Sequence, residues 1–375
     1  MSTFTPPSNE RIAILGAGQM GVAIAAAFLT KRFSVTLFDT SEQALATAHE
    51  RIEAELALQQ VTNVAEFLTN LTCEETLPSV ITDHGSRVTF VLETITEKLR
   101  AKSRLYAEVV PLLGDSAVLV SNTSTISIDQ LAATLPTANN MASRFCGFHF
   151  FHPVRERSLV EIIRGRATSL ETLERATQLA RAIDKTPLVV NDGPGFVVNR
   201  LLNAYLSGSL QLLAEGATIR QIDAAAEEFG MAMGPFRIMD EIGLDVTMHG
   251  GWVLYKAFPG RVEPSPVLLE LVREGHLGRK TGCGFYRYAS STMWESPGTP
   301  HIELESMIAE RFRDGQSNPL PSITNDRIIN RSIGEMFREG RRILADGIVT
   351  SEAEIELAAT LGLGFPKARW KESFV

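Results

Sequence analysis

The sequence has few cysteines and no excess of positive charge. Its three cysteines, Cys73, Cys146 and Cys283, are odd in number, widely spaced and without the spacing of metal ligands. They indicate reduced thiols in a cytosol-like compartment rather than a disulfide framework. The formal net charge is −8, whereas a protein that binds nucleic acid usually has a basic face. We therefore expect a cytoplasmic protein that binds no nucleic acid.

Long apolar runs and targeting signals are also missing. The longest apolar run, within Met20 to Leu29, is too short for a membrane span and is typical of a buried helix. The first ten residues lack the basic and apolar regions of a leader, so we expect a short polar lead-in. With 375 residues, 44% hydrophobic and 21% charged, the chain is expected to form two or three globular domains and no membrane span.

A strand followed by a glycine-rich turn is the clearest pattern near the N-terminus. Arg11 to Leu15 is a short apolar run, typical of a buried parallel strand. A helical stretch from Val22 to Lys31 follows it. Between the two lies the run Gly16-Ala17-Gly18-Gln19-Met20-Gly21. Its first glycine would make a tight turn, its second would admit a pyrophosphate, and its third would let helix and strand pack closely. The whole run, Gln19 and Met20 included, is predicted to bind the phosphates of a dinucleotide at a helix N-terminus.

An acidic residue ends the next predicted strand, Ser34 to Phe38. Asp39 follows this strand roughly twenty residues after the turn, where a carboxylate accepts hydrogen bonds from the adenosine ribose. It would repel the 2′-phosphate of NADP, and no arginine follows it immediately. The arrangement favours NAD as the cofactor of an α/β Rossmann-type domain. The alternative is a glycine-containing loop next to a solvated aspartate.

A histidine and a glutamate supply a candidate general base. His149 lies between two phenylalanines in the run Gly147 to Pro153, and Glu161 follows it by twelve residues. A histidine that is oriented by a carboxylate works as a general base near neutral pH. Together with the dinucleotide pattern, the pair predicts a dehydrogenase that removes a proton and a hydride from an alcohol. The alternative is that His149 is a core residue with satisfied hydrogen bonds.

Further polar residues follow two other predicted strands. Val118 to Ser124 is an apolar run that ends in a hydroxyl-rich loop, and Val88 to Glu93 is a run that precedes Glu97 and Lys102. Ligands of open α/β sheets bind outside the carboxyl ends of the strands, so these residues are candidates for the site. The alternatives are a Ser/Thr turn with a helix cap, and a surface ion pair at a helix start.

Taken together, these patterns resemble the L-3-hydroxyacyl-CoA dehydrogenases of fatty-acid β-oxidation. The resemblance covers nearly the whole chain. It rests on the segments Gly16 to Gly21, Glu93 to Lys102, Ser121 to Ser124, His149 to Pro153, Val160-Glu161, Asp192 to Arg200, Met233 to Phe236 and Gly278 to Tyr286. It implies a Rossmann-type NAD-binding domain that is followed by all-α C-terminal domains.

The resemblance implies catalytic roles for four residues. His149 would be the base that takes the proton of the 3-hydroxyl, and Glu161 would hold the imidazole and stabilise its charged form. Ser124 would hydrogen-bond the reacting oxygen, and Asn199 would help to position the substrate. For Asn199 the alternative is a helix residue that bonds to the neighbouring backbone.

Cofactor-binding roles are implied for Glu97, Lys102 and Lys280, which would lie along the bound NAD with Ser124 beside them. The family has an asparagine where this chain has His152. A histidine can still bond near the nicotinamide, but it is bulkier and titrates closer to neutrality. The pair His149 and His152 also suggests a metal site, but no third ligand has a suitable spacing, so no metal is expected.

A second departure from the family concerns the carrier of the substrate. Relatives often have lysines after the ribose-binding acid, where they meet the phosphates of coenzyme A. Residues Thr40 to Ser86 contain no lysine, one arginine and eight acidic residues, and an acidic face repels a polyanion. An acyl-CoA substrate is predicted. The alternatives are the dehydrogenase of a free 3-hydroxy acid or sugar acid, and a non-catalytic NAD-binding relative.

The C-terminal half contains an internal repeat with an offset of 131 residues. Val198-Asn199-Arg200 recurs as Ile329-Asn330-Arg331, Leu213 to Gly216 recurs as Leu344 to Gly347, and Pro235 recurs as Pro366. The repeat predicts two copies of a helical module, as in the dehydrogenase portion of the multifunctional β-oxidation enzymes that the chain resembles.

The predicted domains follow from these patterns. They are an NAD-binding domain at 1–191, a first helical domain at 192–289, a linker at 290–322 and a second, shorter helical domain at 323–375. Since the two modules can pair within one chain, we expect a monomer or a homodimer. A separate hydratase or thiolase chain is a candidate partner.

Overall fold

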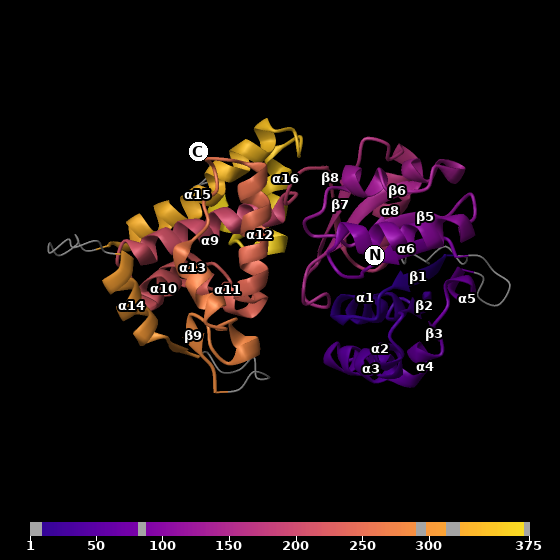
Figure 1. The fold of residues 1–375 in the computed structure, drawn as a ribbon, viewed down its shortest axis with the longest axis horizontal. Coiled ribbons are helices and arrows are strands. Elements are labelled where there is room, and N and C mark those ends of the chain that lie inside the picture. Colours follow the sequence, from indigo (N-terminus) through magenta and orange to yellow (C-terminus); the bar gives the residue numbers. More distant parts are fainter. Residues whose placement is uncertain (1–9, 82–87, 290–297, 313–322, 371–375) are drawn as a thin grey trace. The chain divides into compact units, whose positions relative to one another are not determined.

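A computed structural model describes residues 10–81, 88–289, 298–312 and 323–370 (Figure 1). The chain divides into two compact units, Met1–Phe196 and Val197–Val375. The first unit contains an eight-stranded sheet, and the second is mostly helical. The predicted fold class, a Rossmann-type domain followed by a helical region, is confirmed. None of the described helices has the length and apolar character that a membrane crossing needs.

The first unit is built around one sheet with the strand order β3-β2-β1-β4-β5-β6-β7-β8. Its strands are β1 Arg11–Leu15, β2 Ser34–Phe38, β3 Leu71–Glu74, β4 Phe90–Glu93, β5 Val118–Ser121, β6 Phe145–Phe150, β7 Leu159–Arg164 and β8 Thr186–Asn191. Every neighbouring pair is parallel except β6 and β7, which are antiparallel. The strand order reverses between β1 and β4, and ligands of such sheets bind outside the carboxyl ends of the strands at this point.

Helices connect these strands. They are α1 Gln19–Leu29, α2 Glu42–Ala46, α3 Ala48–Leu58, α4 Val64–Leu68, α5 Leu77–Ile81, α6 Leu99–Val109, α7 Ile128–Ala132 and α8 Leu170–Ala182. Strands β4 and β5 are buried at every residue, as expected for central strands that are covered on both faces. Helix α1 begins three residues before the predicted stretch, because Gly18 serves as its N-cap and the glycine turn leads directly into the helix.

The second unit consists mainly of helices. They are α9 Val198–Ala214, α10 Ile219–Phe229, α11 Pro235–Ile242, α12 Leu244–Ala257, α13 Pro266–Arg273, α14 Ile302–Phe312, α15 Asn325–Ala345 and α16 Glu352–Leu357. Two short strands, β9 Tyr286–Arg287 and β10 Thr299–Pro300, pair antiparallel. The predicted linker therefore contains a strand and a helix within its described residues 298–312, while 290–297 and 313–322 lie outside the described residues. The division of this half into two modules stays a prediction.

The repeated segments pack against each other through α9 and α15. Arg200 is buried and donates from Nε to Glu339 (2.7 Å) and from Nη2 to Asp346 (2.8 Å). At Gly208, an added Cβ would lie 2.2 Å from the carbonyl oxygen of Arg331, so the two helices approach each other closely there. The repeat offset matches Arg200 to Arg331 and Gly208 to Glu339. Both contacts therefore join the same two pairs of repeat-equivalent positions on α9 and α15.

Candidate active site

The antiparallel pairing of β6 and β7 places His149 directly opposite Glu161. Residues that are opposite in this way point to the same face of the sheet, with side chains close enough to bond. Nδ1 of His149 lies 2.8 Å from Oε2 of Glu161, and both side chains are buried, with residue exposures of 3% and 0%. Water therefore competes little for this hydrogen bond, and the carboxylate fixes the plane of the imidazole.

The other ring nitrogen of His149 faces Ser124, which lies in the loop after β5. Nε2 of His149 is 3.1 Å from Oγ of Ser124. Because a carboxylate can only accept, the neutral ring carries its proton on Nδ1, and Nε2 accepts from the serine hydroxyl. The rings of Phe151 and Phe196 flank the imidazole, with centroids 4.5 and 5.8 Å away. The structure thus brings together three of the predicted catalytic residues, with a basic nitrogen directed at a hydroxyl.

Glu97 organises the backbone of the Ser124 loop. Its Oε1 accepts hydrogen bonds from the amides of Ser124 and Thr125 (both 2.9 Å) and from the hydroxyls of Thr123 (2.6 Å) and Thr125 (2.9 Å). Burial opposes the charged form of Glu97. The Lys102 ammonium and these hydrogen bonds outweigh that effect and hold the pKa of Glu97 below its usual value. Its predicted contact with NAD stays a prediction.

Lys102 lies in the interior rather than in a surface pair. Its side chain is 1% exposed, and Nζ donates to both carboxylate oxygens of Glu93 (2.7 and 2.8 Å) and lies 3.3 Å from Oε2 of Glu97. Tyr106 and Ser121 also donate to Glu93, at 2.9 and 2.7 Å. Burial, followed by the charge of Glu93, raises the pKa of Tyr106 well above its usual value. Lys102 therefore joins Glu93, at the carboxyl end of β4, to Glu97, which holds the Ser124 loop after β5.

The sequence reasoning missed Glu93 and Asn122 as site residues. Glu93 lies in a segment that carries the family resemblance, but the pattern assigns it no role, whereas its buried carboxylate is the centre of this cluster. Oδ1 of Asn122 accepts from the amide of Phe150 at 2.8 Å and so fixes the backbone next to His149. The sequence offers one signal for each role. Glu93 is a charged residue at the end of an apolar run, and Asn122 is an amide in a hydroxyl-rich loop.

The glycine turn fits a dinucleotide. The amide of Gly16 donates to Phe38 at 2.7 Å, and its φ of +118° is a conformation that favours glycine. An added Cβ at Gly21 would lie 1.8 Å from the carbonyl oxygen of Gly16, whereas one at Gly18 would have no atom within 4 Å. Gly18 also supplies no side-chain cap to α1, and the first turn of the helix has no acidic residue. The first amides of α1 are therefore available to a pyrophosphate that approaches over Gly18.

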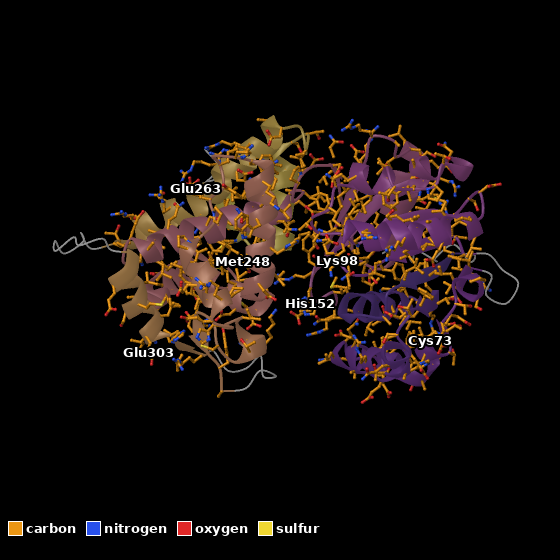
Figure 2. The ribbon with its side chains drawn as sticks, in the orientation of Figure 1. Cys73, Lys98, His152, Met248, Glu263 and Glu303 are labelled. Carbon is orange, nitrogen blue, oxygen red and sulfur yellow. The ribbon has the colours of Figure 1, made fainter. Side chains whose placement is uncertain are left out.

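Asp39 and His152 each contact a residue of this turn. Asp39 follows β2 and accepts from the amides of Ala17 (2.7 Å) and Ser41 (2.9 Å), so its carboxylate is held against the glycine turn. The amide nitrogen of Gln19 lies 3.4 Å from Nε2 of His152, an exposed residue of the first unit (Figure 2). Partial burial of its ring lowers the pKa of His152 and so favours the neutral imidazole.

Two predicted site residues belong to the second unit. Asn199 is the second residue of α9, and Lys280 lies in the short 3₁₀ turn Arg279–Thr281. Nζ of Lys280 donates to Asp245 at 2.5 Å. Burial opposes the charge of Asp245, but the hydrogen bond from Lys280 outweighs it and lowers the pKa of this carboxyl. The predicted roles of Asn199 toward the substrate and of Lys280 toward NAD stay predictions.

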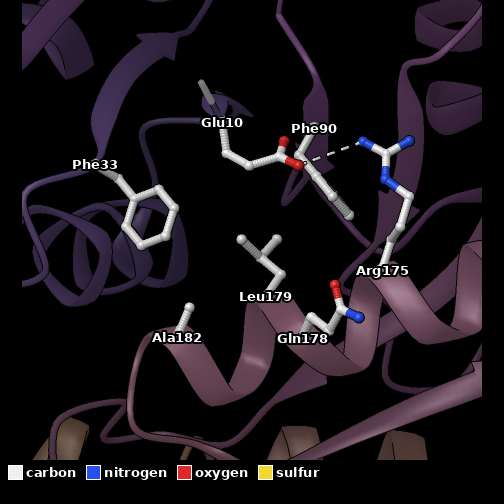
Figure 3. A pocket seen from close by; sticks show the side chains of 7 residues that line it. All are labelled: Glu10, Phe33, Phe90, Arg175, Gln178, Leu179 and Ala182. Atoms are coloured by element: carbon white, nitrogen blue, oxygen red, sulfur yellow. Dashed lines mark ion pairs between the residues drawn. The ribbon is translucent and has the colours of Figure 1, made fainter. Parts of the chain in front are cut away.

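A small cavity lies at the opposite edge of the sheet. Its lining includes Glu10 and Phe90, at the amino ends of β1 and β4, and Arg175 of α8 (Figure 3). Glu10 and Arg175 form an ion pair there at 3.6 Å. The glycine turn follows the carboxyl end of β1, and His149 lies near the carboxyl end of β6. This cavity, at the amino ends of β1 and β4, is therefore separate from the candidate site. Across the described residues, no three His, Cys, Asp or Glu side chains gather as metal ligands would.

Two family models match this chain. The model of the 3-hydroxyacyl-CoA dehydrogenase NAD binding domain matches residues 11–193, and the model of the 3-hydroxyacyl-CoA dehydrogenase C-terminal domain matches residues 195–288. Together they cover more than half of the 375 residues. The first match confirms NAD as the cofactor and the second extends the resemblance into the helical unit.

Solved structures agree with these matches. The (S)-3-hydroxybutyryl-CoA dehydrogenase PaaH1 from Ralstonia eutropha is 32% identical, with a TM-score of 0.68 over 76% of this chain and 100% of that one. The dehydrogenase part of multifunctional enzyme 1 from C. elegans is 29% identical, with a TM-score of 0.67 over 96% of this chain and 79% of that one. A 3-hydroxybutyryl-CoA dehydrogenase from Escherichia coli K12 shares the fold at 24% identity, with a TM-score of 0.81 over 97% and 91% of the two chains.

Removal of the Lys102 charge should destabilise the first unit. The substitution Lys102→Met leaves Glu93 and Glu97 without their buried cation, and breaking such a pair costs about 3–5 kcal/mol. Lys98→Met is the matched control, because Lys98 is exposed and makes no side-chain cap (Figure 2), and its expected effect is within about 0.5 kcal/mol. Urea unfolding that is followed by circular dichroism measures both. Equal unfolding midpoints for the two variants would show that the buried cluster does not stabilise the unit.

Proposed function

This chain belongs to the 3-hydroxyacyl-CoA dehydrogenase family, and we propose that it transfers a hydride between NAD and C3 of a 3-hydroxyacyl-CoA in fatty-acid β-oxidation. The observation that carries the proposal is the arrangement of His149. One ring nitrogen is 2.8 Å from the buried carboxylate of Glu161, and the other is 3.1 Å from the hydroxyl of Ser124. A dinucleotide-binding turn follows β1 of the same sheet.

In the oxidative direction, Nε2 of His149 takes the proton of the 3-hydroxyl group. The C3–H bond breaks at the same carbon, and bound NAD supplies the acceptor for the hydride, so that a C3 ketone forms. The carboxylate of Glu161 stabilises the imidazolium that His149 becomes. The hydroxyl of Ser124 donates to the reacting oxygen in place of its bond to Nε2. In the reverse direction the same imidazolium returns the proton to the ketone.

The buried charges support this chemistry by fixing its geometry in advance. The Ser124 loop is held by Glu97, Glu97 is held by Lys102, and the strand end beside His149 is held by Asn122. Donors and acceptors that are fixed before the reaction need no reorganisation as charge develops. We propose that Asn199 positions the acyl group. We also propose that Lys280 lies along the bound NAD and that His152 lies near its nicotinamide.

Removal of the base should abolish turnover and spare cofactor binding. His149→Ala is expected to lower kcat by about 10²–10⁴, the usual contribution of a general base, with the Kd for NADH unchanged. Glu161→Gln is expected to cost less, because the base remains and only its orientation and charge stabilisation are lost. Steady-state NADH oxidation and NADH fluorescence titration measure the two quantities. His49→Ala, at an exposed position of α3, is the control, and a kcat for His149→Ala close to that of this control would remove His149 from the mechanism.

The acidic helices after Asp39 favour a second candidate function. Glu50 and Glu53 are exposed on α3, and the 40–86 stretch contains no lysine to meet the phosphates of coenzyme A. A smaller, less charged 3-hydroxy compound would avoid this repulsion. The candidate is therefore a dehydrogenase of the same reaction class that acts on a free 3-hydroxy acid.

A comparison of carriers separates the two candidates. NADH oxidation is measured with acetoacetyl-CoA, with the same acyl group on a truncated pantetheine thioester, and with free acetoacetate. We expect the highest kcat/KM with the CoA ester, because its remote binding energy contributes to the rate. Equal or higher kcat/KM with free acetoacetate would support the second candidate. Equal or higher kcat/KM with the pantetheine thioester alone would show that the enzyme acts on a thioester without recognising the phosphates of coenzyme A.

A further inference from the structure

One basic side chain reaches the glycine turn from the acidic helices. Arg51 is the single Lys or Arg residue between Thr40 and Ser86, and it lies in the first half of α3. Its Nη1 donates to the carbonyl oxygen of Ala17 at 2.8 Å. The amide of the same residue, Ala17, donates to Oδ2 of Asp39 at 2.7 Å. The guanidinium of Arg51 is therefore held at the carbonyl group of Ala17, and the carboxylate of Asp39 is held at its amide.

These two side chains have opposite preferences for the cofactor. A carboxylate after the second strand accepts from the ribose hydroxyls and repels a 2′-phosphate, whereas a nearby arginine accommodates a 2′-phosphate. A guanidinium carries five N–H groups in a planar fork that matches phosphate, and its bond to Ala17 uses one of them. Arg51 is half-buried and so its orientation is restrained by the protein.

We propose that Arg51 belongs to the adenosine end of the cofactor site, where it would bind a 2′-phosphate if Asp39 did not repel one. The chain then contains a latent 2′-phosphate site, with the guanidinium of Arg51 as its cation and the carboxylate of Asp39 opposing the phosphate at the glycine turn. The inference rests on the proposed role of Asp39 in binding the ribose. The competing role for Arg51 is purely structural, as a tether between α3 and the glycine turn.

Binding titrations without acyl substrate test the inference. NADH and NADPH are titrated by nicotinamide fluorescence into the wild-type protein and into the variants Asp39→Asn, Arg51→Met and the double variant. The wild-type protein should prefer NADH. Asp39→Asn should tighten NADPH binding by about tenfold to a hundredfold, which corresponds to the 1.5–3 kcal/mol of a hydrogen bond to a charged group. In the double variant this gain should disappear.

A matched control separates local from general charge effects. Glu53→Gln removes one negative charge from an exposed position on the same helix, and it should leave the NADPH affinity unchanged. Three results would overturn the inference: no gain in NADPH affinity for Asp39→Asn, a gain that persists in the double variant, or a gain in Glu53→Gln. Each of these results can occur while the wild-type protein binds NADH normally. Loss of NADH binding by the wild-type protein would instead contradict the proposed function itself.

Discussion

The antiparallel pairing of β6 with β7 is the constraint on which the site depends. In a sheet that is otherwise parallel, this one reversal puts two residues that are twelve apart in sequence directly opposite each other. Their side chains then share a face and meet at 2.8 Å without a long connection. A slip of one residue would send His149 to the other face of the sheet. The candidate site therefore depends on the register of β6. Asn122 helps to hold this strand in place by accepting from the amide of Phe150.

A second consequence follows from how the neighbouring loop is held. The buried residues Glu93 and Lys102 and the half-buried Glu97 form a chain of charges from the end of β4 to the amide of Ser124. Buried ion pairs are a weak source of stability, because desolvation offsets most of their attraction. Their value here is geometric, since each oxygen and each ammonium proton has an assigned partner. The protein thus keeps the hydroxyl of Ser124 at the basic nitrogen before any substrate arrives.

The sequence predicted the parts of the site that are local. The glycine turn, Asp39 and the strands around them follow short patterns, and the pair His149 and Glu161 lies in two neighbouring apolar runs. It did not predict Glu93, Asn122 or Arg51, because their partners are set by packing between segments that lie 9 to 34 residues apart. The alternative that Lys102 forms an ion pair on the surface is wrong for the same reason. The burial of Lys102 depends on which helix covers the ends of the strands. The sequence likewise did not predict helix α14 within the linker, because polar segments precede and follow it.

The central claim is that Glu161 acts on the reaction through His149, and a double-mutant cycle tests it most directly. kcat for NADH oxidation with acetoacetyl-CoA is measured for Glu161→Gln, His149→Ala and the double variant. Because residues that act as one unit are non-additive, the account predicts that Glu161→Gln lowers kcat in the wild-type background and changes it little once His149 is alanine. Fully additive losses would contradict the account and give Glu161 a role that is independent of the histidine.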